Sequence, residues 1–434
     1  MYDWANSAYN LVITSTIFPA YYVAITRSQN PGQPDYVEFF GRRFINTALQ
    51  DYTLALVFLI VAISSPILSS IADYRRNKKV WLRWFCYLGS ASCIALYWFT
   101  SNHIEFGMIA FALAALGYWA SLVFYNSYLP EIAAPEDQDR VSAKGFSMGY
   151  IGSVTLQLIC FVIILLPEKF GFTQQAIDAS VPVRLSFLLT GLWWFGFAQI
   201  TLRAMPLSPR AERKAKTHVL LNGFKELNLV WKQLTHLPAL KRFLLSFFLY
   251  SMGVQTVMLV AAGFAGKEIF PDPADQPKLL ATIIIIQLVA VAGAQLMSRL
   301  SKRLGNWWVI TLAVLIWIII CIWGYYIQGQ STFYALAALV GLVMGGIQSM
   351  SRSTYSKLLP PTQDTTSFFS FYDVTEKIAI VIGIFLFGYL EELTGSMRNS
   401  ILALMVVFIL AVLALLYTRP AFKKYFAIGN RTPA

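Results

Sequence analysis

Long apolar runs recur along the whole length of this chain, separated by short polar segments. Each run is close to the roughly 20 residues that a helix needs to cross about 30 Å of hydrocarbon. Only 13% of the 434 residues are charged, whereas a soluble domain carries roughly 25%. These features exclude an ordinary soluble globular protein and a disordered chain. They predict an all-α integral membrane protein.

The runs predict twelve membrane helices, six on each side of a long polar segment. The expected spans are 4–26, 49–72, 81–101, 105–128, 146–166, 183–206, 243–266, 279–299, 307–328, 332–350, 368–390 and 398–418. Such an even split is typical of transporters built from structural repeats, and predicts two pseudo-symmetric six-helix bundles. The expected divisions are an N-terminal bundle over 1–206, a linker over 207–242, a C-terminal bundle over 243–418 and a tail over 419–434.

The basic residues indicate which helix ends face the cytoplasm. Most of the 34 Lys and Arg residues fall in every second loop, in the central linker and in the tail. Because Lys and Arg concentrate on the cytoplasmic side of membrane proteins, we expect a plasma (inner) membrane protein with both termini inside. The Arg42-Arg43 pair, in the first outer loop, fits this rule least well. Topology thus explains the net charge of +12, and no nucleic-acid partner is expected.

Nothing in the sequence indicates an enzyme or a cofactor. Cys86, Cys93, Cys160 and Cys321 fall inside apolar runs without paired spacing, so we expect small buried side chains. The three histidines form no cluster with metal-ligand spacing. The chain also has no P-loop and no catalytic triad, so any transport is expected to be secondary, driven by gradients.

The central linker carries an amphipathic pattern. Leu220, Phe224, Leu227, Trp231 and Leu234 recur at spacings of three and four residues, with polar residues between them. This pattern predicts a helix that lies on the inner membrane surface or against the bundle. A structural tether between the two halves is the favoured interpretation, and a partner-binding role is the alternative.

The second span closes with residues 70–79. This segment has a small residue, followed by Asp73 and then by clustered basic residues that include Arg75 and Arg76. This segment resembles the loop of the major facilitator superfamily that joins its second and third helices. An Asp here can accept hydrogen bonds from the start of a neighbouring helix and pair with Arg, which would act as a conformational latch. The alternative is a simple positive-inside stop signal. A weaker copy at 298–305 lacks the Asp, so a latch there must differ.

Four further segments carry a more specific resemblance. They are residues 2–9 (YDWANSAY), 124–132, 140–152 and 348–353. Together they resemble the branch of that superfamily that contains the autophagy-related vacuolar amino-acid effluxers and a large bacterial set. The resemblance runs from residue 2 to about residue 400, and implies export of amino acids or similar small solutes. Relatives carry a short hydrophilic segment before this element, which implies that Met1 is internal to a longer protein.

Polar residues mark one face of the first span. Asp3, Ser7, Asn10 and Thr14 follow one another at helical spacing, with Asn6 beside them. A polar stripe in an apolar membrane helix must face protein or water. Asp3 is either a helix N-cap or a substrate or proton group. The two asparagines are candidates to line a cavity, with interhelical hydrogen bonds as the alternative.

Neutral polar residues deep in other spans complete the candidate cavity. They are Tyr125, Asn126, Gln255, Gln287 and Gln348. Such groups can orient an uncharged or zwitterionic solute without a large desolvation cost. Each alone is typical of packing between helices. Together they favour a site for a polar small molecule.

The eleventh span contains Asp373, Glu376 and Lys377. If this helix begins near Phe368, Lys377 lies about 14 Å deep at 1.5 Å per residue. Charges at such depth are costly unless paired, and point to function. Asp373 and Lys377 are four residues apart and can form an ion pair. Glu376 is three residues from Asp373, and a desolvated carboxylate beside another binds a proton more readily, as proton coupling requires. Proton coupling and a purely structural salt bridge both fit this pattern.

Glycines at spacings of three and four residues predict close helix contacts. They are Gly145, Gly149 and Gly152 in the fifth span and Gly341 and Gly345 in the tenth.

The sequence therefore predicts a secondary active transporter of a small polar solute, working by alternating access. Its expected partners are the solute, protons and the lipid bilayer, and we expect a monomer. The alternative is a lipid or hydrophobic-drug exporter, which the 15% aromatic content favours.

Overall fold

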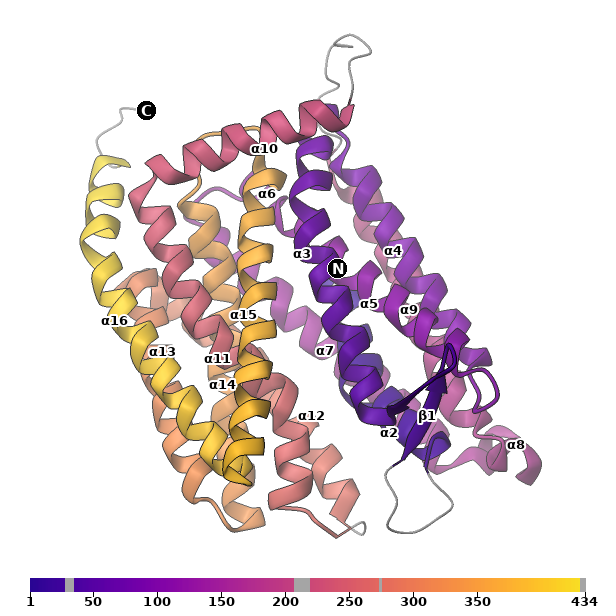
Figure 1. The fold of residues 1–434 in the computed structure, drawn as a ribbon. Helices are drawn as coiled ribbons and strands as arrows, with labels where there is room; N and C mark the ends of the chain where they lie inside the picture. The colour runs from indigo at the N-terminus through magenta and orange to yellow at the C-terminus, as the bar shows by residue number, and fades with distance from the viewer. Residues whose placement is uncertain (28–34, 207–218, 273–274, 430–434) are drawn as a thin grey trace. The chain divides into compact units, whose positions relative to one another are not determined.

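The computed structural model describes residues 1–27, 35–206, 219–272 and 275–429, and long helices dominate them (Figure 1). Among these residues, ten helices are long and apolar enough to cross a membrane. Two more, α4 (Lys78–Ala95) and α15 (Thr365–Thr394), lie at the expected spans 81–101 and 368–390. The 18 residues of α4 include Lys78, Lys79 and Arg83, and α15 has charged residues in its interior.

The remaining spans follow the expected order. In the first half they are α1–η1–α2 (Tyr2–Tyr9, Asn10–Thr16, Ile17–Ile25), α3 (Asn46–Arg75), α5 (Ile104–Asn126), α7 (Gln138–Leu165) and α9 (Val181–Ala204). In the second half they are α11 (Pro238–Glu268), α12 (Gln276–Leu304), α13 (Asn306–Tyr326), α14 (Gln330–Lys357) and α16 (Met397–Gly429). Short elements connect them: η2 (Leu96–Trp98), α6 (Leu129–Ile132), η3 (Pro167–Phe170) and α8 (Gln174–Asp178).

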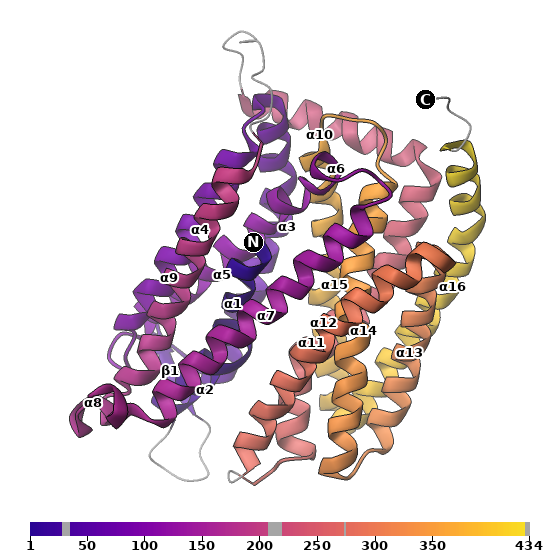
Figure 2. The same cartoon turned by 180° about the vertical axis from the view of Figure 1, so that it is seen from behind.

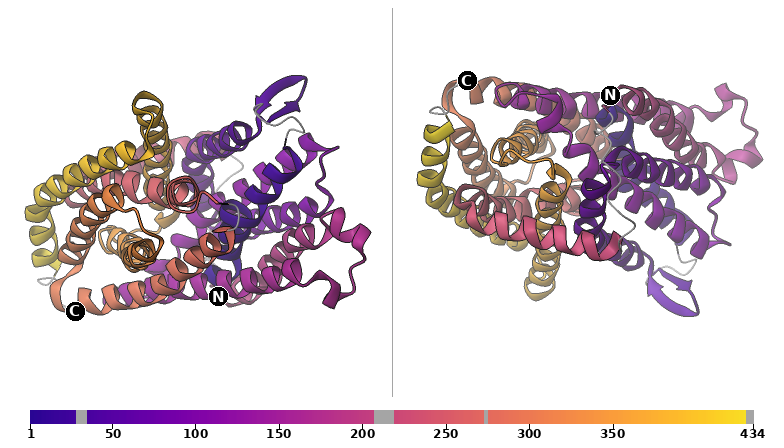
Figure 3. Two further views of the ribbon diagram at one scale, coloured as in Figure 1. Left: turned by 90° about the horizontal axis from the view of Figure 1, so that it is seen from below. Right: turned by 90° about the horizontal axis from the view of Figure 1, so that it is seen from above.

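The first outer loop forms a hairpin that the apolar pattern does not predict. Strands β1 (Tyr36–Phe39) and β2 (Arg42–Ile45) pair antiparallel and project from the helices of their unit (Figure 3). Phe40 and Gly41, between the strands, both have positive φ, as the two-residue type I′ turn requires. Glu38 lies opposite Arg43 in the register, which gives this arginine an acidic neighbour.

The chain packs as two compact units. Unit 1 comprises Met1–Val61, Asn77–Tyr125 and Met148–Ser208, and unit 2 comprises Ala62–Arg76, Asn126–Ser147 and Pro209–Ala434. The end of α3 and the segment around α6 thus pack with the second half of the chain. The expected bundle boundaries at residues 206 and 243 remain a prediction.

In unit 1, glycines allow helices to approach closely. A methyl group at Gly149 of α7 would overlap the hydroxyl of Ser7, and one at Gly152 would overlap the carbonyl oxygen of Trp4. The indole of Trp4 stacks on Trp193 of α9, with 5.5 Å between ring centroids. These contacts hold α1 against both α7 and α9, as the glycine spacing predicts for α7.

In unit 2, α12 and α14 lie side by side along much of their length (Figure 2). A methyl group at Gly341 would overlap the carbonyl oxygen of Ile286, and one at Gly345 would overlap that of Ala290. The backbone of α12 therefore occupies the space where these side chains would be. The expected close contact of the tenth span is present.

The described part of the linker contains helix α10 (Val219–His236), which runs across the ends of α11 and α15 (Figure 1). Of its five patterned positions, Leu220, Phe224 and Leu227 have side chains outside the described residues. Leu234 is buried, while Trp231 is exposed and lies 5.6 Å from the ring of Phe371 in α15. This contact ties α10 to the bundle end.

Candidate solute and coupling site

Asp3 joins the first span of unit 1 to α5. Asp3 is buried, and its carboxylate accepts a hydrogen bond from the hydroxyl of Tyr125. The ring of Tyr125 lies 4.8 Å from that of Tyr2. Met1 occupies the N-cap position of α1, and no side chain donates or accepts a capping bond there. Asp3, in the first turn of α1, thus contacts a neighbouring helix.

Asn6 is the most unusual polar residue of this span. Its side chain is 1% exposed, and neither its amide nitrogen nor its amide oxygen has a hydrogen-bond partner among the described residues. Burying an amide without partners costs about 1–3 kcal/mol by mutational measures. Unpaired buried polar atoms in native proteins are rare and call for an ordered water, a ligand or a functional role. Asn6 is therefore a solute-binding candidate in unit 1.

The first span is not a regular α-helix from Asn10 onward, because Asn10–Thr16 forms a π-helix. Its wider turns change which residues share a face. Pro19 supplies the physical reason, since a proline cannot donate to the carbonyl of Ser15 four residues earlier and crowds it. Within this turn, the hydroxyl of Ser15 donates to the carbonyl of Asn10 at 2.9 Å. Asn10 itself is half-buried.

Gln157 is a buried residue of this region that the sequence analysis missed. It is 1% exposed in α7, and its Oε1 accepts a hydrogen bond of 2.9 Å from the hydroxyl of Thr16. The sequence does contain a signal for this residue, because an amide side chain inside the apolar run 146–166 is expected to face protein. Gln157 links the π-helical turn to α7 and adds a polar group beside the first span.

In unit 2, polar side chains form a continuous chain from α11 through α15 to the end of α3. Gln255 donates from Nε2 to Oε1 of Glu376 at 2.8 Å. The other carboxylate oxygen of Glu376 lies 3.0 Å from the ammonium of Lys377. Lys377 also lies 3.0 Å from Asp373, so the expected ion pair is present. The hydroxyl of Ser65 lies 3.5 Å from Oδ2 of Asp373 and completes the chain.

The depth and burial of this cluster matter for its chemistry. α15 begins at Thr365, three residues before the expected start, which places Lys377 about 18 Å along the helix. The side chain of Lys377 is fully buried and that of Asp373 is 6% exposed, whereas that of Glu376 is 16% exposed. Glu376 is therefore the most exposed member of the cluster.

Two of the other predicted amides, Gln348 and Asn126, form hydrogen bonds with other residues. Gln348 donates to the sulfur of Met258 at 3.2 Å, and Gln287 is half-buried on α12. Asn126 accepts a hydrogen bond of 3.2 Å from Arg352. Among the predicted amides, Gln255 bonds directly to one of the three charged side chains.

Arg352 organises a second buried group, which the sequence analysis also missed. Besides Asn126, it donates from Nε to the hydroxyl of Ser142 and from Nη2 to the carbonyl of Ser142, both at 3.0 Å. Its guanidinium lies 4.4 Å from the ring of Phe146. The tenth span was expected to end at residue 350, but α14 continues to Lys357, which buries Arg352 inside the unit. This arginine fastens the start of α7 to α14.

The candidate latch residues lie at the start of α15. Asp73 accepts hydrogen bonds from the backbone amide of Ser367 at 2.6 Å and from its hydroxyl at 2.8 Å. Arg76 donates to the side chain of Gln363 and, at 3.1 Å, to its carbonyl. Arg75 is exposed. Asp73 thus satisfies donors that a helix start leaves open, and its role as a latch remains a prediction.

Residues 298–305, the weaker copy of this motif, have no Asp of their own, and a carboxylate of α7 takes its place. Asp139, at the start of α7, accepts from the hydroxyl of Ser301 at 2.8 Å and from the amide of Asn306 at 2.9 Å. The ammonium of Lys357 lies 2.6 Å from the same carboxylate. Both ends of this ion pair are largely buried. Asp139 therefore holds the ends of α12 and α14 and the start of α13 together.

This fold is that of solved membrane transporters. The chain superposes on a variant of the Escherichia coli fucose:proton symporter FucP with a TM-score of 0.67 and 14% identity, covering 96% of each chain. The proton:xylose symporter XylE gives a TM-score of 0.66 and 14% identity, over 95% of this chain and 92% of that one. The architecture is the major facilitator fold, which confirms the predicted all-α membrane class.

The sequence comparisons identify the family. The family described as vacuole effluxer Atg22 like matches residues 1–138 and 135–421, and the chain belongs to this family. The MFS-type transporter YxiO of Bacillus subtilis (strain 168) is 29% identical over 417 residues, which cover 96% of this chain and 93% of the relative. Autophagy-related protein 22-1 of Aspergillus terreus (strain NIH 2624 / FGSC A1156) is 25% identical over 462 residues, covering 85% and 74%. The protein is a multi-pass membrane transporter and not an enzyme.

Proposed function

We propose that this transporter exports a small polar, amino-acid-like solute and couples that export to protons. The observation that carries the proposal is the buried chain of Gln255, Glu376, Lys377 and Asp373 in unit 2. Charged groups inside a membrane bundle are expensive and mark pathways for ions or substrates. A purely structural ion pair would need one carboxylate for one ammonium, and this cluster has a second carboxylate.

The second carboxylate allows the cluster to bind a proton or a cationic group. With both carboxylates ionised, Lys377 balances only one of them, and the cluster carries an excess negative charge. A proton on Glu376, or the ammonium group of a bound solute, would neutralise it. Glu376 is the more exposed of the two carboxylates, so it is the group that a proton or solute can reach. Competition between proton and solute for one carboxylate is a direct physical basis for coupling.

Other features support the solute class. The unpaired amide of Asn6 can both donate and accept hydrogen bonds, which suits a carboxylate or amide on a small solute. The family name contains the word effluxer, which supports export. The distribution of basic residues supports a plasma-membrane orientation with both termini inside. The alternative of a lipid or hydrophobic-drug exporter gains no support from the relatives.

The test uses the purified chain in detergent and in proteoliposomes. Unfolding temperatures are measured with increasing concentrations of amino acids, sugars, nucleosides and short peptides. A true ligand at about 100 times its Kd stabilises the folded state by about 2.7 kcal/mol. We expect stabilisation by one or more amino acids, and counterflow of the same compounds in proteoliposomes that depends on a pH gradient. Stabilisation by sugars or nucleosides alone would contradict the proposed solute class.

A further inference from the structure

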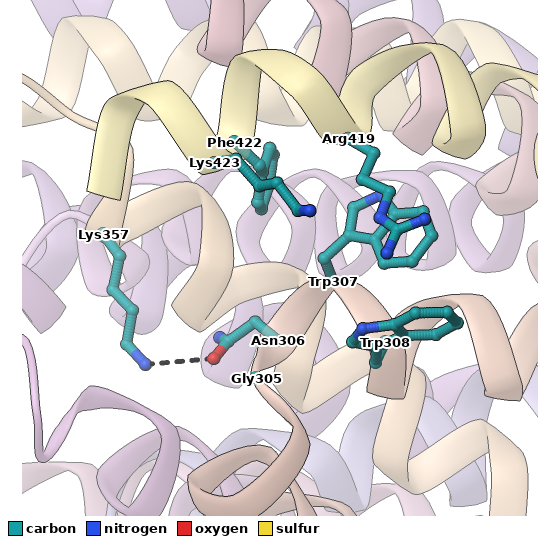
Figure 4. Close-up of a pocket in the computed structure, with 8 residues that line it drawn as sticks. All are labelled: Gly305, Asn306, Trp307, Trp308, Lys357, Arg419, Phe422 and Lys423. Carbon is teal, nitrogen blue, oxygen red and sulfur yellow. Dashed lines mark hydrogen bonds between the residues drawn. The ribbon is translucent and has the colours of Figure 1, made fainter. Parts of the chain in front are cut away.

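A cavity of about 360 Å³ opens in unit 2 where α13 begins and α16 ends its apolar run. It is lined by Gly305, Asn306, Trp307, Trp308, Lys357, Arg419, Phe422 and Lys423 (Figure 4). Three of these residues are cationic, and none is acidic. The cavity is separate from the α15 cluster, and the transport proposal does not use it.

The cations of this cavity differ in how their charges are balanced. Lys357 is paired with Asp139 at 2.6 Å and bonded to Asn306 at 3.3 Å. Within the described part of the chain, neither Arg419 nor Lys423 has a carboxylate partner. Two adjacent cations facing one cavity repel each other unless an anion lies between them. The unbalanced charge therefore favours an anionic ligand.

Two tryptophans hold Arg419 in place. Its guanidinium carbon lies 5.1 Å from the ring of Trp307 and 4.9 Å from that of Trp308. A guanidinium that stacks on aromatic faces keeps its N–H donors in its own plane, free for a forked contact with a phosphate. Gly305, with φ of +82° and no side chain, leaves the first amides of α13 without a side-chain cap. These amides add donors beside the cavity.

The surroundings indicate where the ligand comes from. After Trp308 in the chain, exposed apolar residues continue at helical spacing along α13. They are Leu312, Leu315 and Ile319. Tyr417, close before the cavity on α16, is also exposed. Trp and Tyr gather where a bilayer's hydrocarbon meets its headgroups. The cavity thus lies at the end of a lipid-facing apolar stripe, at headgroup level.

From this geometry we infer that the cavity binds the phosphate group of an anionic phospholipid. Arg419 would hold the phosphate in a forked contact, Lys423 would supply a second cation, and the acyl chains would follow the apolar stripe of α13. Free phosphate compounds share the same headgroup chemistry but cannot use the stripe. The lipid is therefore expected to bind more tightly than its soluble headgroup.

The test titrates the full chain in a neutral detergent with phosphatidylglycerol, phosphatidylcholine or glycerol 3-phosphate, and follows the unfolding temperature and the lipid retained in native mass spectrometry. We expect saturable stabilisation by phosphatidylglycerol, at least tenfold weaker binding of phosphatidylcholine, and no saturation by glycerol 3-phosphate at equal concentration. Equal effects of the two lipids would overturn the inference. Equal effects of glycerol 3-phosphate and phosphatidylglycerol would overturn the lipid assignment.

Variants localise the effect. Arg419→Gln with Lys423→Gln is expected to weaken phosphatidylglycerol binding at least tenfold, and Lys423→Gln alone at least threefold. Lys423 is exposed, so the single variant should fold even if the double variant does not. Lys424→Gln is the matched control, because Lys424 is an exposed neighbour that does not line the cavity. Unchanged binding in Lys423→Gln, or an equal loss in Lys424→Gln, would refute this site.

Discussion

The backbone nitrogen of Ser367 lies 2.6 Å from Oδ2 of Asp73, so the carboxylate at the end of α3 binds the first turn of α15. Both residues belong to unit 2, although they are far apart in the sequence. Carboxylates at a helix start accept from open amides and interact favourably with the helix dipole. α15 also carries the charged cluster proposed for coupling. One carboxylate thus controls the attachment of the helix on which that cluster depends.

Asp73→Ala should lower the free energy of unfolding by about 1–2 kcal/mol, because it removes this capping interaction. Thermal unfolding in detergent measures the change. Asp364→Ala is the matched control, since Asp364 occupies the N-cap position of α15 but makes no side-chain capping bond. We expect that control to stay within about 0.5 kcal/mol of the wild type. Equal losses in the two variants would show that Asp73 is not the effective cap.

Glu376→Gln should abolish pH-driven transport and weaken solute binding at least tenfold, because the solute's ammonium group loses the carboxylate for which it competes with the proton. The amide can still accept from Gln255, but it cannot carry a proton as a carboxylate does. Flux in proteoliposomes at several pH gradients measures the effect. Glu391→Gln is the control on the same helix, because Glu391 pairs with the exposed Lys267. Wild-type proton dependence in Glu376→Gln would refute the coupling role.

Lys377→Met should destabilise the protein by about 3–5 kcal/mol, because it leaves Asp373 buried without its cation. Adding Asp373→Asn should restore part of that loss, since the buried charge is then removed as well. Lys267→Met should cost less than about 1 kcal/mol, because its ion pair with Glu391 is exposed. Unfolding curves of the four proteins test the series. A double variant no more stable than Lys377→Met would argue against the pairing.

Gly345→Ala should destabilise the α12–α14 contact by about 1–3 kcal/mol, because the new methyl group would overlap the carbonyl of Ala290. Gly388→Ala in α15 is the opposite case, since nothing lies within 4 Å of the added methyl group. Alanine favours a helix over glycine by up to about 1 kcal/mol, so this control should be neutral or stabilising. Thermal unfolding compares the two. A similar shift in both variants would contradict the packing argument.

Asn6→Leu should leave stability unchanged or raise it, because neither amide atom of Asn6 has a partner to lose among the described residues. Solute affinity should fall at least tenfold if Asn6 contacts the solute. Asn46→Leu is the matched control, since its amide donates to Thr26 at 2.8 Å and its oxygen accepts from the amide of Thr47 at 2.7 Å. That variant should cost about 1–3 kcal/mol. A large loss of stability in Asn6→Leu would indicate a structural role instead.

The charged residues of α15 illustrate how far sequence reasoning reaches. Asp373 and Lys377 are one helical turn apart, so their ion pair follows from local geometry alone. The bond from Gln255 to Glu376 joins residues 121 positions apart, and no spacing rule predicts it. Arg352 was missed for a different reason. The tenth span was predicted to end at residue 350, seven residues too early, so Arg352 was not recognised as a buried residue of that helix.

By itself the sequence determined the features that depend on local composition: the membrane class, the order of the spans, the helix in the linker and the close approach at Gly345. Hydrocarbon forces each span to satisfy its own backbone, so length and hydropathy suffice to find most of them. Only the tertiary structure decided which distant groups share a charge or a proton. It assigned Asp139 to Lys357 and left the amide of Asn6 open within the described part of the chain, because contacts between helices depend on packing that no single helix encodes.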